Sequence, residues 1–175
     1  MKMLVTGATG YIGGRLVPRL LEAGHEVRVF VRDPVRLRDV PWASQVEVAT
    51  GDLANAGDVA RAVAGIDVLY YLVHSMSSTG DFERTERHVA STVAAAAAAA
   101  QVGRIVYLGG LHPEGKLSPH LRSRKEVGDI LMASGVPTAA LQAGVVIGSG
   151  SASFEMIRHL TEVLPYMPAP NWVPN

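Results

Sequence analysis

Residues 2–14 read KMLVTGATGYIGG, and this stretch predicts a strand, a tight turn and the first turn of a helix. The apolar run at residues 3–5 suits a strand that is buried on both faces. Three glycines then lead the chain into a helix that begins near residue 11. Their spacing predicts that Gly7 permits the turn, that Gly10 brings the backbone close to a ligand, and that Gly13 lets the helix pack against the strand.

This arrangement predicts a binding site for a dinucleotide. The first N–H groups of a helix lack helical partners, and together with the helix dipole they favour an anion such as a diphosphate. Glycine-rich turns also occur where nothing binds. Here, however, the turn follows a strand, opens a helix and precedes a second strand about 20 residues later, as the dinucleotide fingerprint requires. The residues expected at the diphosphate are Gly7, Thr9, Gly10, Tyr11, Ile12 and Gly13.

The composition indicates a small domain with a substantial apolar core, since 48% of the 175 residues are hydrophobic. Sixteen basic residues balance sixteen acidic ones, which gives no reason to expect a nucleic acid or an acidic membrane as partner. The absence of cysteine excludes disulfides and thiolate chemistry. Neither a signal peptide nor an apolar run of membrane-spanning length is evident, so we expect a cytoplasmic protein with a small-molecule substrate.

Strands and helices alternate along the rest of the chain. After the first strand, further strands are predicted at residues 26–31, 46–48, 66–73, 104–108 and 138–147. Helices are predicted at residues 12–23, 55–64, 81–101, 120–133 and 152–163. Gly109-Gly110 is expected to break the fifth strand. The alternation predicts an α/β fold, a Rossmann-like doubly wound parallel sheet of about six strands with helices on both faces.

We therefore expect a dinucleotide-binding Rossmann domain over residues 1–150. Residues 151–175 are expected to start a substrate-side segment that this chain holds only in part, ending in proline-rich sequence.

The spacing Gly-x-x-Gly-x-x-Gly, with Thr6 before it and Tyr11-Ile12 inside it, resembles the short-chain dehydrogenase/reductase superfamily in its extended or atypical branch. Residues 118–124 and 148–155 look most like an NmrA-like group of NAD(P)-binding proteins, many of which are described as epimerases or reductases. The resemblance implies that Asp52 and Leu53 lie beside the adenine, with a plain turn aspartate as the alternative for Asp52.

The end of the second strand bears on the choice of cofactor. An acid there accepts hydrogen bonds from the ribose 2′-OH of NAD, whereas a basic side chain can hold the 2′-phosphate of NADP. The acid position falls on Val31 and the next residue is Arg32, which favours NADP over NAD. Asp33 competes for the acid role, but its place before Pro34 is typical of a helix cap. The alternative for Arg32 is an ordinary exposed arginine.

The end of the fourth strand, Leu72, Val73 and His74, is expected to pass over the cofactor at the switch point of the sheet. His74 could contact the ribose or the nicotinamide. A histidine that donates a hydrogen bond to a nearby carbonyl is the alternative.

The active-site motif departs from the superfamily pattern. Its relatives place Tyr-x-x-x-Lys on the helix after the fifth strand and a hydroxyl residue at the end of that strand. The matching positions here hold His120 and Arg124, with glycines in place of the hydroxyl. Histidine, with a reference pKa of about 6.5, can supply a proton, although a nearby cation lowers its protonated fraction. The alternative is a capping histidine and a surface arginine.

Two functions of different classes remain open. The first is an NADP-dependent oxidoreductase or epimerase with a modified proton donor, and the second is a non-catalytic NADP-binding sensor. No nucleophile elbow and no metal-ligand spacing is present in the sequence. The superfamily commonly pairs the helices expected at residues 81–101 and 120–133 between two subunits, which implies a homodimer. The alanine run at residues 94–100 serves a monomeric core equally well.

Overall fold

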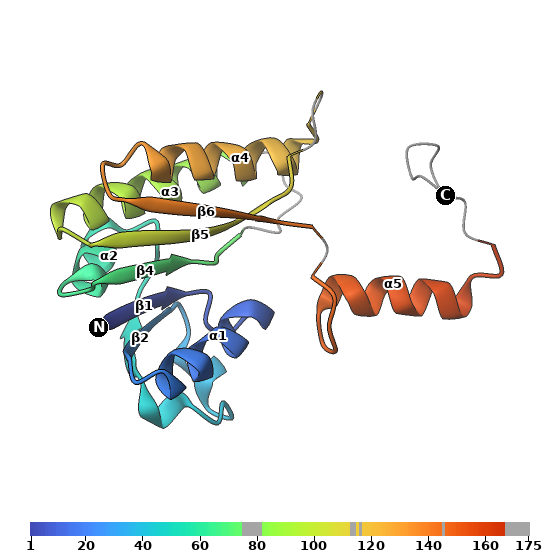
Figure 1. The fold of residues 1–175 in the computed structure, drawn as a ribbon, viewed down its shortest axis with the longest axis horizontal. Helices are drawn as coiled ribbons and strands as arrows, with labels where there is room; N and C mark the ends of the chain where they lie inside the picture. The colour runs from blue at the N-terminus through green and yellow to red at the C-terminus, as the bar shows by residue number, and fades with distance from the viewer. Residues whose placement is uncertain (75–81, 113–114, 116, 145, 167–175) are drawn as a thin grey trace. The chain divides into compact units, whose positions relative to one another are not determined.

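The computed structural model describes residues 1–74, 82–112, 115, 117–144 and 146–166 (Figure 1). The chain divides into two compact units, Met1–Ala143 and Gly144–Asn175. No helix within the described ranges is both long enough and apolar enough to cross a membrane.

The first unit is built on one six-stranded parallel sheet in the order β3-β2-β1-β4-β5-β6 (Figure 1). The strands are β1 (Lys2–Thr6), β2 (Glu26–Val31), β3 (Glu47–Thr50), β4 (Val68–Tyr71), β5 (Arg104–Gly110) and β6 (Thr138–Ala143). The chain winds outward from β1 to β3 and then starts again on the other side of β1 with β4. The order therefore reverses between β1 and β4, and the crevice at their carboxyl ends is where such sheets bind ligands. The predicted Rossmann-like fold is confirmed.

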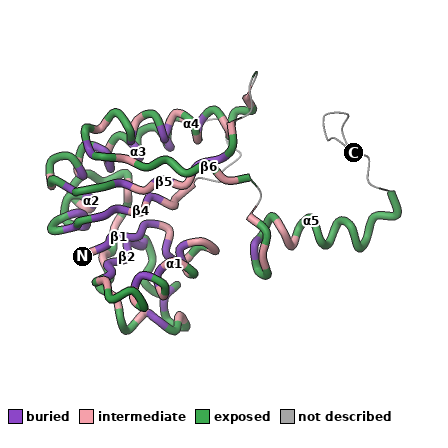
Figure 2. The backbone as a smooth tube through the Cα atoms, in the orientation of Figure 1, coloured by how far each residue is buried: buried purple, intermediate pink, exposed green. Residues whose placement is uncertain are grey.

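Helices cover both faces of this sheet. The helices are α1 (Tyr11–Glu22), α2 (Ala56–Val63), α3 (Phe82–Ala99) and α4 (Pro119–Met132), with short 3-10 helices at Pro34–Leu37 and Ala43–Gln45. One buried cluster lies under α2, α3 and α4, and a second lies under α1 on the opposite face. Figure 2 shows that the central strands β1, β2 and β4 are mostly buried, whereas the edge strands β3 and β6 are largely exposed. Burial on both faces explains why the central strands read as continuous apolar runs.

The predicted end of β5 was wrong. Gly109 and Gly110 do not break the strand, because they remain in register with Gln142 and Ala143 of β6. A Cβ on Gly109 would lie 2.9 Å from the Tyr107 ring, so this glycine is explained by packing. Two other strands are shorter than predicted: β4 ends at Tyr71 and β6 ends at Ala143.

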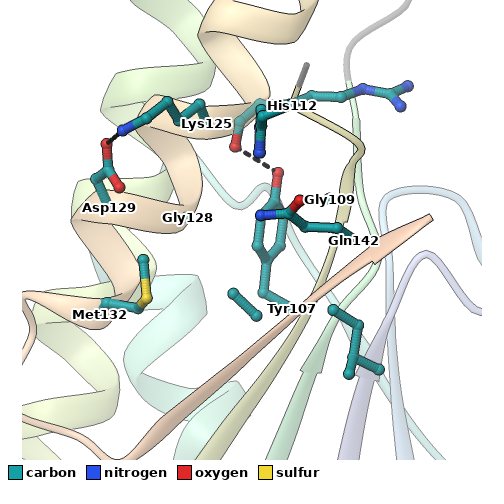
Figure 3. A pocket seen from close by; sticks show the side chains of 11 residues that line it. Tyr107, Gly109, His112, Lys125, Gly128, Asp129, Met132 and Gln142 are labelled. Carbon is teal, nitrogen blue, oxygen red and sulfur yellow. Dashed lines mark hydrogen bonds and ion pairs between the residues drawn. The ribbon is translucent and has the colours of Figure 1, made fainter. Parts of the chain in front are cut away.

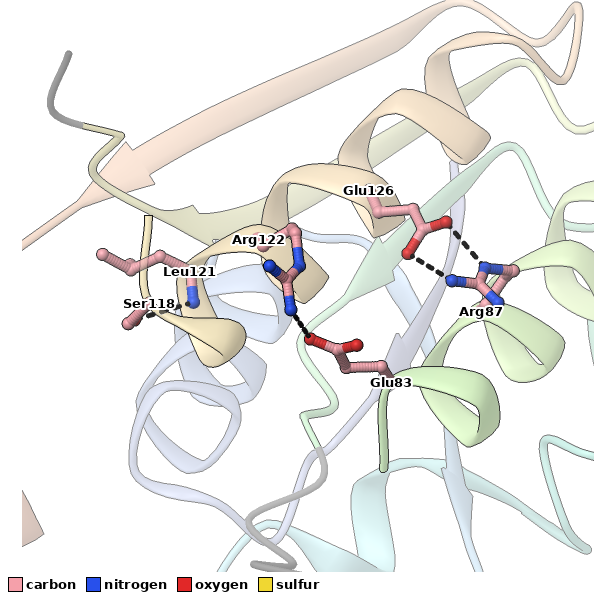
Figure 4. A network of polar contacts seen from close by, with 6 residues as sticks. All are labelled: Glu83, Arg87, Ser118, Leu121, Arg122 and Glu126. Carbon is pink, nitrogen blue, oxygen red and sulfur yellow. Dashed lines mark hydrogen bonds and ion pairs between the residues drawn. The ribbon is translucent and has the colours of Figure 1, made fainter. Parts of the chain in front are cut away.

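One side of the alanine run of α3 belongs to the core. Ala90, Val93, Ala94 and Ala97 are buried at helical spacing, and the small side chains let α3 pack closely beside α2 and α4. Two ion pairs cross from α3 to α4 on the exposed side (Figure 4). Arg87 of α3 binds Glu126 of α4 in a bidentate ion pair at 2.6 and 3.1 Å. Arg122 of α4 binds Glu83 of α3 at 2.8 Å.

Helix α1 continues through a proline because another donor replaces the missing one. Pro18 has no N–H to offer to the carbonyl of Gly14, four residues earlier. The indole Nε1–H of the buried Trp42 donates to that carbonyl at 3.3 Å. The contact ties the segment after β2 to the first helix.

The second unit contains α5 (Ala152–Val163). The Ser151 side chain donates to the Val146 carbonyl at 2.7 Å just before this helix. Arg158 pairs with Glu155 and Glu162 along the helix. Residues 167–175, which include most of the predicted proline-rich tail, lie outside the described ranges.

Candidate cofactor site

The glycine-rich turn joins β1 to α1 in the form that an anion site needs. Gly7 has a φ of +73°, which a residue with a side chain rarely adopts, and its carbonyl accepts from the Gly10 N–H at 3.0 Å. Gly10 precedes the helix without a side-chain cap, and the first turn of α1 contains no acid. No side chain of the described residues thus caps the N–H groups at this helix start, which is the arrangement that favours an anion. Thr9 lies in the turn, and Tyr11 and Ile12 open the helix.

Gly13 sets how closely α1 packs on the turn. A Cβ at this position would lie 2.3 Å from the Gly7 carbonyl oxygen and 2.7 Å from the Ala8 Cα. Both distances are far below van der Waals contact. The neighbouring Gly14 differs, because its Cβ would lie 3.7 Å from the Ala8 carbonyl oxygen, an ordinary contact. Close packing at Gly13 is thus what the sequence spacing predicted.

Thr6 holds the fourth strand against this turn, a role that the sequence interpretation missed. Its buried hydroxyl donates to the Tyr70 carbonyl at 3.1 Å and accepts from the Leu72 N–H at 3.2 Å. A Cβ on Gly7 would lie 3.0 Å from the Leu72 carbonyl oxygen, so the backbone of Leu72 covers the turn. Val73 and His74 follow directly, at the switch point. A polar residue at the end of a buried apolar strand was the available signal.

At the end of β2, Arg32 and Asp33 have separate roles. The Asp33 carboxylate accepts from the Val35 N–H at 3.0 Å and caps the 3-10 helix, which confirms the predicted cap. Arg32 is exposed and makes no hydrogen bond or ion pair with any residue in the described ranges. Its guanidinium is therefore available beside the strand end.

Asp52 follows β3 in a tight turn. Its Oδ1 accepts from the Ala54 N–H at 2.9 Å, and its own N–H donates to the Asp58 carboxylate at 2.9 Å. The turn aspartate foreseen as the alternative is thus present, and one carboxylate oxygen remains without a hydrogen bond to a described residue. Leu53 is half-buried and packs against the core.

His74 lies between the end of β4 and the end of β5. The Nε2 of its ring lies 2.9 Å from the Leu108 carbonyl oxygen, so Nε2–H donates, which confirms the foreseen alternative of a histidine bonded to a carbonyl. The edge of the Tyr107 ring meets the imidazole with centroids 6.0 Å apart. Burial, followed by the positive charge of Arg124, lowers the pKa of His74 to about 4. At neutral pH this imidazole is uncharged.

His120 and Arg124 occupy successive turns of α4. The hydroxyl of Ser118 caps the helix by accepting from the Leu121 N–H at 3.3 Å, so the alternative of a capping histidine was wrong. The exposed His120 ring stacks on Phe82 with centroids 4.6 Å apart. Arg124 is half-buried. Its side chain lies at the end of β5, where a Cβ on Gly110 would be 3.6 Å from the Arg124 Nη1. The charge of Arg124 acts on His74, which the sequence interpretation did not connect with α4.

A small hollow of about 100 Å³ lies between α4 and β6 (Figure 3). The Tyr107 ring forms its floor, and the phenol donates to the Arg124 carbonyl at 2.8 Å. Burial raises the pKa of Tyr107, so the phenol stays protonated at neutral pH. A Cβ on Gly109 would lie 2.9 Å from the Tyr107 ring, and a Cβ on Gly128 would lie 3.2 Å from it. A glycine inside a predicted helix was the signal for a large neighbour at this point.

No group of histidine, aspartate and glutamate side chains in the described part of the chain could hold a metal ion.

Comparison with known proteins gives the family. A model of an NAD(P)H-binding family matches residues 7–147, which is most of the chain. The chain belongs to this NAD(P)H-binding family. Its structural neighbours are NAD(P)-binding dehydrogenases, reductases and epimerases of the short-chain type, as the sequence resemblance implied.

Two curated relatives of this NAD(P)H-binding chain illustrate the sequence similarity. A 3-beta-hydroxysteroid dehydrogenase of Mycolicibacterium neoaurum is 41% identical over 87 residues, which cover 50% of this chain and 23% of that protein. Sterol demethylase protein B of Methylococcus capsulatus is 34% identical over 132 residues, covering 69% of this chain and 39% of that protein. The chain thus spans well under half the length of these relatives.

Solved structures share the fold. The triphenylmethane reductase of Citrobacter sp., complexed with NADP(H), matches with a TM-score of 0.74 at 23% identity, over 93% of this chain and 55% of that one. A nucleoside-diphosphate-sugar epimerase from Staphylococcus aureus matches with a TM-score of 0.68 at 19% identity, over 81% and 50%. At these identities the similarity shows the fold alone.

Proposed function

We propose that this chain binds NADP(H) in preference to NAD(H) and is the cofactor-binding part of an oxidoreductase or epimerase. The observation that carries the cofactor preference is Arg32, which directly follows the acid position held by Val31 at the end of β2 and has no partner among the described residues. The N-terminus of α1 would hold the diphosphate, and Asp52 and Leu53, after β3, would lie beside the adenine. Leu72, Val73 and His74 would pass over the cofactor at the switch point, where His74 would lie near the ribose or the nicotinamide.

The family context supports a reaction at a carbonyl or hydroxyl carbon of a small molecule. The names of the relatives include a hydroxysteroid dehydrogenase and a reductase complexed with NADP(H). The nicotinamide, when bound, supplies or accepts a hydride. The residues of this chain then move the proton: His120 delivers it to the substrate oxygen, and Arg124, one turn further along α4, binds the ribose hydroxyls. The neutral His74 keeps its bond to Leu108 and shapes the floor of the site.

A non-catalytic sensor is the second candidate. Neither tyrosine nor lysine occupies the proton-transfer positions of α4, and β5 ends in two glycines. The His120 ring is also stacked on Phe82, and this contact restricts the rotation that a proton donor would use. A surface that changes when the nucleotide binds would then carry the function.

One experiment separates the two candidates. NADPH oxidation is followed with a panel of ketones and aldehydes, and NADPH affinity is measured on the same preparation by calorimetry. Turnover with any member supports the oxidoreductase. Tight binding with no turnover across the panel contradicts an oxidoreductase and is expected of the sensor or of an epimerase, which oxidises no NADPH overall. The absence of NADPH binding contradicts both candidates.

If His120 is the proton donor, carbonyl reduction should become faster as the pH falls, because only a protonated imidazole can supply the proton. The His120→Ala variant should lose this rise, whereas His88→Ala, an exposed histidine of α3, should retain it. The measurement is a pH–rate profile of each protein. A brisk and pH-independent rate that survives His120→Ala would place the chemistry elsewhere, with His74 the next candidate.

We also predict that two copies associate through α3 and α4, whose outer sides form a continuous helical surface with the ion pairs of Figure 4. These pairs lie within one chain, so they order the surface without themselves joining two copies. Light scattering should give twice the mass of one chain. A monomer at high protein concentration would contradict this prediction.

A further inference from the structure

The charges on α4 are matched except at one residue. Arg122 pairs with Glu83 at 2.8 Å, and Lys125 pairs with Asp129 at 2.6 Å. The other acid of this helix, Glu126, binds Arg87 through both carboxylate oxygens. Both acids of α4 are therefore engaged by other cations, which leaves Arg124 as the remaining cation of the helix.

The guanidinium of Arg124 makes no hydrogen bond or ion pair with any side chain or backbone group in the described ranges. Arg124 is nevertheless half-buried, unlike its exposed neighbours Arg122 and Lys125. Removing a cation from water is costly unless an opposite charge is near, and no described residue supplies one to Arg124 through a hydrogen bond or an ion pair.

The Arg124 side chain lies beside Gly110 at the end of β5. A Cβ on Gly110 would lie 3.5 Å from the Arg124 Cδ, 3.6 Å from its Nη1 and 3.1 Å from the Leu121 Cδ2. The relatives of this fold are expected to hold a hydroxyl residue here and a lysine on the helix. A larger residue here would press on Leu121 and would make only ordinary contact with Arg124, so the guanidinium lies close to the backbone of this strand end.

The surroundings of Arg124 favour an anion over a neutral group. The charge of Arg124 acts on the pKa of His74 and on that of Tyr107, and both groups are uncharged at neutral pH. The phenol of Tyr107, also kept protonated, bonds to the Arg124 carbonyl and fixes the backbone from which the side chain extends. The position at the carboxyl end of β5 is also where the substrate of the proposed reaction would lie.

We propose that Arg124 binds a carboxylate of the substrate, so that the preferred substrate class is an oxo acid or hydroxy acid rather than a neutral ketone or alcohol. This inference rests on the proposed function. A guanidinium presents its N–H groups in a planar fork that matches the two oxygens of a carboxylate, and lysine offers no such fork. The five N–H donors of the guanidinium allow one edge to bind the carboxylate while another contacts the ribose.

Matched pairs of acids and methyl esters test this inference. Pyruvate and acetoacetate are each compared with their methyl esters, in phosphate-free buffer, by calorimetric titration of the protein with and without NADPH. We expect each acid to bind at least about tenfold more tightly than its ester, as a charge-assisted bidentate pair implies. Arg124→Gln should abolish the preference and Arg124→Lys should retain part of it. Arg122→Gln, a paired cation of the same helix, should leave it unchanged.

Equal affinity for acid and ester, or a preference that survives Arg124→Gln, would overturn the inference. The NADPH titration is read separately. A carboxylate preference without NADPH binding would support the anion site and contradict the proposed function, whereas NADPH binding without the preference would do the reverse.

Discussion

Gly13→Ala is expected to lower the free energy of unfolding by at least about 2 kcal/mol and to abolish NADP(H) binding. The added methyl group would lie 2.3 Å from the Gly7 carbonyl oxygen and 2.7 Å from the Ala8 Cα. Both are backbone atoms that cannot rotate away, so α1 must move off the turn and its N-terminal N–H groups move with it. Urea denaturation measures the first effect, and calorimetric titration with NADPH measures the second.

The neighbouring Gly14→Ala substitution is the matched control. Its methyl group would lie 3.7 Å from the Ala8 carbonyl oxygen, and alanine is favoured over glycine inside a helix by up to about 1 kcal/mol. We expect this variant to be as stable as the wild type or more so, and to bind NADPH normally. If both variants behaved alike, close packing of α1 on the turn would not explain the glycine at position 13.

Arg32→Ala is expected to weaken NADPH binding by roughly 10- to 100-fold, the equivalent of about 1.5 to 3 kcal/mol for a charge-assisted contact with the 2′-phosphate. NADH affinity should change little, because NADH has a hydroxyl at that position. The loss should diminish as salt is added, since Arg32 is exposed.

Arg104→Ala serves as the control for Arg32→Ala. Arg104 is also exposed, but it is the first residue of β5. It therefore lies at the amino ends of the strands, whereas Arg32 lies at their carboxyl ends. Its removal should leave both nucleotide affinities unchanged. Equal losses of NADPH and NADH affinity in Arg32→Ala would contradict the role assigned to the 2′-phosphate.

The sequence predicted the features of this protein that depend on local pattern. Apolar runs bounded by glycines located the strands, and the spacing of Gly7, Gly10 and Gly13 located the turn. Asp33 was predicted as a cap because the residue before a proline at a helix start serves that purpose.

The sequence could not predict contacts that arise only when distant strands become neighbours. The bond from His74 to Leu108 joins residues 34 positions apart, and it exists because β4 and β5 are adjacent. The Thr6 bridge to β4 depends in the same way on the switch in strand order. Gly109 and Gly110 were misread because a glycine required for packing against Tyr107 has the same appearance in sequence as a glycine that ends a strand.

Calorimetric titration of the wild-type chain with NADPH and with NADH is the most direct test of the central claim, that the turn after β1 and the arginine after β2 form an NADP(H) site. We predict one saturable site per chain for NADPH and an affinity for NADH that is lower by at least about tenfold. Equal affinities for the two nucleotides, or no saturable binding of NADPH, would contradict it.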